Sequence, residues 1–139
     1  MILFLLLWVL PPSELLDKAG ELFDGQHWHQ TIEVINESLP ELRQSGDEET
    51  LAECLSMLSI AYFRIGAFAP AWDAQYECYQ LDLASGDAGN ISSSLNTLAG
   101  ICLAMENYDE GERLIREAIA CEEKLGQTEA LAVRYGMAS

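Results

Sequence analysis

Two histidines flank a tryptophan at His27-Trp28-His29, and Asp24 lies just before them in the sequence. Imidazole and carboxylate groups are common ligands of zinc and other transition metals. These residues fall in an expected turn, however, and no matched third ligand accompanies the two histidines. The sequence therefore predicts no metal and no cofactor, and we interpret Trp28 as a packing residue. A metal-dependent enzyme that uses His27 and His29 is kept as an alternative hypothesis.

The other residue types that carry chemistry do not combine into an active site. The four cysteines form no CxxC pair, and we interpret them as small buried hydrophobes that stay reduced. They are Cys54, Cys78, Cys102 and Cys121. The sequence shows neither a Ser/His/Asp nor a Cys/His set in a pattern typical of nucleophilic catalysis, and it has no glycine-rich phosphate loop. It thus predicts that the chain is not an enzyme.

Two polar side chains are better suited to binding another chain. The amide of Asn96 offers one acceptor and two donors, which match the C=O and N–H groups of a peptide backbone. The alternative is an asparagine that hydrogen-bonds within its own fold. The guanidinium of Arg64 is suited to a ligand carboxylate, and its alternative is a surface ion pair.

The chain that must position these side chains repeats itself every 40 residues without insertion or deletion. Leucines, aromatic residues, glycines and small residues each recur at their own phase of this period. These four sets are Leu15/Leu55/Leu95, Trp28/Phe68/Tyr108, Gly46/Gly86/Gly126 and Ala19/Ser59/Ala99. Small positions opposite bulky ones are what closely packed helices require. A fixed period of this length predicts a solenoid, in which each unit packs against its neighbours.

Within each period, apolar residues at helical spacing predict two amphipathic helices joined by a short turn. The three pairs are expected in residues 13–46, 47–86 and 87–126, and a partial fourth unit in 127–139 starts a further helix near residue 128. Glycine is expected to stop a helix at positions 46, 86 and 126, and the aspartates that follow the first two glycines to cap the next helix. Pro40 predicts a kink or an early end of its helix. The expected fold class is all-α, a right-handed α-α superhelix of three helix pairs plus one terminal helix.

The charge of the chain excludes several classes of partner. Asp plus Glu number 23 and Lys plus Arg number 7, which gives a formal net charge of −16. A field of this sign repels phosphate backbones and anionic lipid head groups. The sequence therefore predicts no nucleic-acid partner and no direct membrane binding by the repeats.

Residues 1–12 form an apolar tail that begins MILFLLLWVL and ends at Pro11-Pro12. The apolar run is too short to cross a bilayer, which takes about 20 residues. It has the apolar centre of an export signal but lacks a basic start and an A-x-A cleavage site. We interpret the run as the remnant of such a signal, as an artificial chain boundary, or as a tail packed on the domain. The first interpretation favours a periplasmic over a cytoplasmic parent protein. We expect it to cover an apolar surface, and homo-oligomers could form through the tail or the solenoid ends.

The stretch SLNTLAGICLAMENYDEGERLIREAI combines the small and large positions with an aromatic residue after the turn. On these residues the chain resembles the tetratricopeptide repeat family. The longer period and the Leu-x-x-x-Gly-Asp ending at residues 83–87 are similar to the variant found in kinesin light chains and bacterial regulators. The resemblance covers residues 13–139 and departs from the pattern at Lys18, Pro40 and Gln75.

The resemblance implies that one stripe on the first helix of each pair lines a concave groove that holds a peptide. The binding residues expected on this stripe are Ser56, Ile60, Phe63 and Arg64 in the second repeat and Ser92, Asn96, Gly100 and Leu103 in the third. By the same resemblance, Asn96 would hold the peptide main chain. The predicted function is a non-catalytic scaffold that binds a protein or peptide partner. The alternative is the sensory or regulatory arm of a larger bacterial signalling protein.

Overall fold

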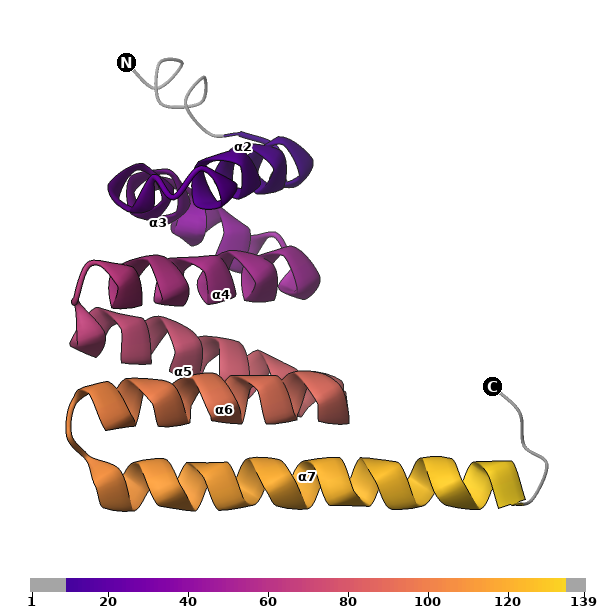
Figure 1. Ribbon diagram of the computed structural model, residues 1–139. Coiled ribbons are helices and arrows are strands. Elements are labelled where there is room, and N and C mark those ends of the chain that lie inside the picture. Colours follow the sequence, from indigo (N-terminus) through magenta and orange to yellow (C-terminus); the bar gives the residue numbers. More distant parts are fainter. Residues whose placement is uncertain (1–9, 135–139) are drawn as a thin grey trace, which may run out of the picture. The chain divides into compact units, whose positions relative to one another are not determined.

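The computed structural model describes residues 10–134, and every secondary-structure element in that range is an α-helix (Figure 1). The helices are α2 (Pro12–Asp24), α3 (Trp28–Gln44), α4 (Glu48–Arg64), α5 (Phe68–Ser85), α6 (Ala88–Ala104) and α7 (Tyr108–Arg134). The chain divides into two compact units, Met1–Leu81 and Asp82–Ser139, and the division falls within α5. The all-α class predicted from the sequence is confirmed. No helix in the described range is long and apolar enough to span a membrane.

The first unit packs α2, α3 and α4 around a cluster of buried aliphatic side chains. Leu15, Ile35 and Leu55 are among its most buried members. The small residues expected at close approaches are fully buried, and Ser59 on α4 donates a hydrogen bond of 2.9 Å to the carbonyl oxygen of Ala71 on α5. Because Ser59 and Ala71 are small, the two helices can approach until a side-chain hydroxyl reaches the opposite backbone.

The second unit is built on α6 and α7, which run antiparallel along each other (Figure 1). Leu95, Leu98 and Ile101 on α6 are almost completely buried, as are Leu114 and Ala118 on α7. The Ser94 hydroxyl also donates a 2.5 Å hydrogen bond to the Asp82 carboxylate, which ties the last turn of α5 to α6.

Two of the three predicted glycine stops are confirmed. Gly46 and Gly86 have φ values of 78° and 76°, in the left-handed region where a side chain is strained. The aspartate after each glycine caps the next helix: Asp47 accepts from the backbone N–H of Thr50 at 3.1 Å, and Asp87 from that of Asn90 at 2.9 Å.

The separate terminal helix expected near residue 128 is not found, because α7 continues through Gly126 to Arg134. Gly126 is followed by glutamine, whereas Gly46 and Gly86 are each followed by a capping aspartate. Without a cap to start a new helix, the existing helix continues, and the Thr128 hydroxyl bonds back to the Lys124 carbonyl at 2.9 Å. Residues 127–134 thus belong to α7. The partial repeat assigned to 127–139 stays a prediction, and residues 135–139 lie outside the described range.

Of the kink or early end predicted at Pro40, the early end is wrong. Helix α3 keeps Pro40 inside it and continues to Gln44. The proline removes one backbone donor, but Leu39 and Leu42 on either side of it are buried in the core of the first unit. We conclude that tertiary packing of these leucines outweighs the local cost of the missing hydrogen bond.

The cap at Asp47 predicts a pH-dependent contribution to stability. Its carboxylate accepts from the Thr50 hydroxyl at 2.7 Å and from the Thr50 backbone N–H, and these bonds lower the pKa of Asp47 below its ordinary value. A carboxyl whose pKa is depressed on folding stabilises the protein above its unfolded pKa, and this contribution is lost as the pH falls through the folded pKa. Denaturant unfolding should therefore show that the free energy of unfolding falls more steeply below about pH 4 in the wild type than in Asp47→Asn. The asparagine amide caps the helix without titrating. Parallel pH profiles would contradict this.

Candidate functional site

The eight residues predicted to bind a peptide fall into two sets, one in each compact unit. Ser56, Ile60, Phe63 and Arg64 lie on α4, and Ser92, Asn96, Gly100 and Leu103 lie on α6. Each set is described separately.

A shallow depression of about 560 Å³ lies between α6 and α7 in the second unit. It is lined by Gly89, Ser92, Ser93, Asn96, Thr97, Glu122 and Leu125. The Asn96 side chain is exposed and makes no hydrogen bond with the described part of the chain. Its donors and its acceptor are therefore available to a ligand.

Ser92 has a different role from the one predicted for it. Its side chain is buried, and its hydroxyl makes a 2.8 Å hydrogen bond to Glu122 Oε1 on α7, with the Ala118 carbonyl oxygen at 3.4 Å. The hydroxyl is thus used within the fold. Because it holds one carboxylate oxygen, it orients Glu122 at the depression rather than presenting itself to a ligand.

Glu122 and Leu125 were not predicted from the sequence, although they form the α7 side of the depression. A signal was available in Ser92, a small polar residue on the packed side of α6 that needs a hydrogen-bond partner from the neighbouring helix.

Gly100 and Leu103 do not line the depression. Gly100 is half-buried, and Leu103 is 42% exposed near the turn that joins α6 to α7. Leu103 Cδ2 lies 3.2 Å from where a Cβ on Gly111 would stand, so this leucine explains the glycine in α7. The structure therefore brings Asn96 and Ser92 together and leaves these two residues apart from them.

On α4, the guanidinium of Arg64, which was predicted to suit a ligand carboxylate, contacts an aromatic ring. The Arg64 guanidinium carbon lies 5.8 Å from the centre of the Trp28 ring, a cation–π contact. The rings of Trp28 and Phe23 also pack edge to face, with 5.4 Å between their centroids. This contact confirms the packing role predicted for Trp28. Among the salt bridges of the described residues none involves Arg64, so the surface ion pair considered as an alternative is not formed.

The other three predicted α4 residues are partly buried or packed against a neighbouring ring. Ser56 and Ile60 are only half-buried, whereas Phe63 is 38% exposed and packs on Phe68 at a centroid distance of 5.3 Å. The face of α4 that carries these residues is thus partly committed to packing within the first unit.

The histidine pair is exposed on either side of Trp28. Within residues 10–134, no group of three or more His, Cys, Asp or Glu side chains is arranged to hold a metal ion. His27 instead lies beside Gly25 at the turn between α2 and α3, where its ring comes within 2.8 Å of a Cβ built on that glycine.

Three of the four cysteines are buried, and all four are free thiols. Burial, helped by the nearby carboxylates of Glu53 and Asp47, raises the pKa of Cys54 to about 11. Burial also raises the pKa of Cys102. Since the thiolate is the reactive form, these side chains are poor nucleophiles at neutral pH and act as core hydrophobes, as predicted.

Comparison with known proteins identifies the fold of the chain. No family model matches the sequence, and no curated protein matches it. Among solved structures, the TPR domain of Arabidopsis FLU is similar with a TM-score of 0.73 at 12% sequence identity, over 81% of this chain and 95% of that one. At this identity the likeness establishes architecture alone, and the 40-residue variant of the repeat stays a prediction. The chain therefore has the fold of a tetratricopeptide repeat domain.

Proposed function

We propose that this chain is a non-catalytic module that binds a peptide segment of a partner protein in the depression between α6 and α7. The observation that carries the proposal is the exposed amide of Asn96, which is free of hydrogen bonds to described residues and lies at a depression that also contains Glu122. The fold, shared with a TPR domain, supports a role in protein interaction but does not name the partner.

The lining of the depression indicates the chemistry of the bound segment. Asn96 matches a peptide backbone, Glu122 matches a cationic group, and Leu125, which is 38% exposed, offers an apolar contact. Ser92 limits the freedom of Glu122, so less side-chain entropy is lost when a cation binds. The net charge of −16 adds long-range attraction for a basic segment. The preferred ligand is thus a peptide with a lysine or arginine next to an apolar residue.

The test is binding of the whole chain to an array of peptides that vary in charge, followed by titration of the best binder by fluorescence polarisation. Asn96→Ala should weaken the affinity about fivefold to tenfold, since one hydrogen bond contributes about 1 kcal/mol. Glu122→Gln should weaken binding at least as much and reduce its salt dependence, because the amide can still accept from Ser92 but carries no charge.

Matched controls are available beside each residue. Asn90 and Glu123 are exposed, lie on the same two helices and do not line the depression, so Asn90→Ala and Glu123→Gln should leave the affinity unchanged. Binding that survives both Asn96→Ala and Glu122→Gln would refute the proposed surface. If Arg64→Ala abolished that binding instead, the α4 residues predicted from the sequence would be the binding face.

A further inference from the structure

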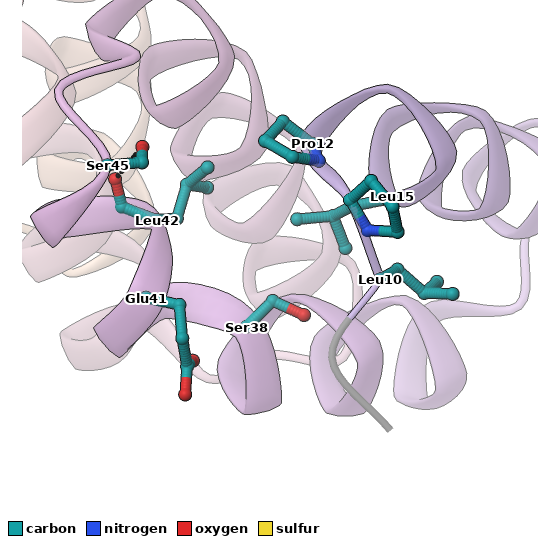
Figure 2. A pocket seen from close by; sticks show the side chains of 8 residues that line it. Leu10, Pro12, Leu15, Ser38, Glu41, Leu42 and Ser45 are labelled. Carbon is teal, nitrogen blue, oxygen red and sulfur yellow. Dashed lines mark hydrogen bonds between the residues drawn. The ribbon is translucent and has the colours of Figure 1, made fainter. Parts of the chain in front are cut away.

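Apolar surface outside the depression occurs in both units. In the first unit it forms a pocket of about 250 Å³ beside Leu10, at the edge of the described range (Figure 2). In the second unit it forms a stripe along α7, where Tyr108 and Ile119 are 61% and 48% exposed and Ile115 is half-buried. The side of α7 that packs against α6 is a different one and carries the buried residues Leu114 and Ala118. Helix α7 is therefore apolar on a second side as well as on the side that it buries.

Six positions of α7 make up this stripe, and their spacing alternates between four and three residues, as in the seam of a coiled coil. They are Tyr108, Glu112, Ile115, Ile119, Glu122 and Gly126. The series of spacings reads the same from either end, so a second α7 that runs antiparallel to the first presents matching positions. Each of the first three positions then lies opposite one of the last three in the other copy: Tyr108 with Gly126, Glu112 with Glu122, and Ile115 with Ile119.

The opposing side chains of this seam match in size. The ring of Tyr108 is placed opposite Gly126, and a Cβ built on Gly126 meets no atom within 4 Å, so the space beside this glycine is open. Among residues other than proline, glycine is the least favourable inside a helix, and no contact within the described chain explains its presence at this position. A ring packed against it from a second copy supplies that reason. The isoleucines form the apolar centre of the seam on both sides of the two-fold axis.

The two glutamates are the unfavourable pair of the seam, and Arg116 offsets their repulsion. Arg116 makes a 2.6 Å ion pair with Glu112, and both side chains are exposed. A guanidinium has five N–H donors, so Arg116 can also bind Glu122 of the other copy, which lies opposite Glu112. The two-fold axis repeats this contact, which gives each glutamate pair one guanidinium. Sizes and charges that match under this reversal fit a second copy of the chain.

We propose that two copies of this chain associate through the α7 stripe, with the two helices antiparallel and the two-fold axis level with Glu117. Glu122 is the residue that this seam shares with the lining of the depression. A seam made by one pair of helices is a small interface, so we expect a dissociation constant in the micromolar range. Each copy carries a net charge of −16, and their repulsion is best screened at about 1 M salt, where the Debye length is about 3 Å.

Light scattering of the full chain at this salt concentration, from micromolar to millimolar protein, tests the association. The mass of the wild type should rise from that of the monomer to about twice that value. Ile119→Glu should remain a monomer with unchanged circular dichroism, because it places a charge from each copy in the apolar centre. Ala120→Glu adds the same charge at the next position, which is exposed and lies off the stripe, and should dimerise like the wild type. A wild type that stays monomeric, or an Ile119→Glu variant that still dimerises, would overturn the proposal.

A size swap tests the antiparallel register and does not depend on the isoleucine variant. Gly126→Tyr places two rings where the wild type has one ring and a glycine, and should weaken the dimer at least about tenfold. Adding Tyr108→Ala should restore the association, because the large and the small residue have then only exchanged positions. Both residues are exposed, so the fold of the monomer should not change. Equal dissociation constants for the single and the double variant would overturn this register.

Discussion

Replacing Leu55 with alanine is expected to lower the free energy of unfolding by about 2–5 kcal/mol, the largest effect we predict for a single substitution. Leu55 is only 1% exposed and belongs to the apolar cluster of the first unit. The substitution removes three carbon atoms from a packed interior. Neighbours on α2 and α3 are fixed by their own contacts, so the structure can collapse only partly around the cavity.

The matched control is Leu83→Ala, the same change at a leucine that is 49% exposed. Surface substitutions of this kind usually change stability by no more than about 0.5 kcal/mol. Urea unfolding followed by circular dichroism measures both free energies under one condition. Equal losses at the two positions would contradict the assignment of Leu55 to the core.

Alanine substitutions at Gly86 and Gly126 are expected to change stability in opposite directions, although these glycines occupy the same phase of the repeat. Gly86 has a φ of 76°, and an alanine there costs about 1–2 kcal/mol from steric strain. Gly126 lies inside α7, where alanine is about 1 kcal/mol more favourable than glycine. A Cβ at either position would meet no atom within 4 Å, so packing does not obscure the comparison.

Thermal unfolding of the two variants beside the wild type measures this difference directly. We expect Gly86→Ala to lower the Tm and Gly126→Ala to raise it or to slow hydrogen exchange in α7. A loss of stability on Gly126→Ala would mean that this glycine does stop a helix, as its phase in the repeat first suggested.

The architecture could be predicted from the sequence because its signals are local. Gly46 with Asp47 and Gly86 with Asp87 each combine a left-handed stop with a cap within two residues. The recurring leucines at positions 15, 55 and 95 gave the buried face of α2, α4 and α6. Where one of these local signals was missing, as after Gly126, or was outweighed by packing, as at Pro40, the predicted helix boundary was wrong.

The candidate site was harder to predict because its geometry depends on contacts between residues far apart in the sequence. Asn96 was selected from its position on the repeat, and its role in binding stays a prediction. The Ser92–Glu122 hydrogen bond joins residues 30 positions apart, and the contact of Arg64 with Trp28 joins two different helix pairs. Which of two partners a polar side chain takes depends on distances that a sequence period does not specify.

Helix α7 has 27 residues and its neighbour α6 has 17, so α7 extends about ten residues, or about 15 Å, past the start of α6 (Figure 1). Among the described residues of the second unit, no helix lies beside its final turns, which depend on their own backbone hydrogen bonds. The amide protons of residues 126–134 should therefore exchange with deuterated solvent much faster than those of residues 111–122. Protection of these amides by an added peptide would show that the ligand reaches beyond the depression and along the projecting end of the helix.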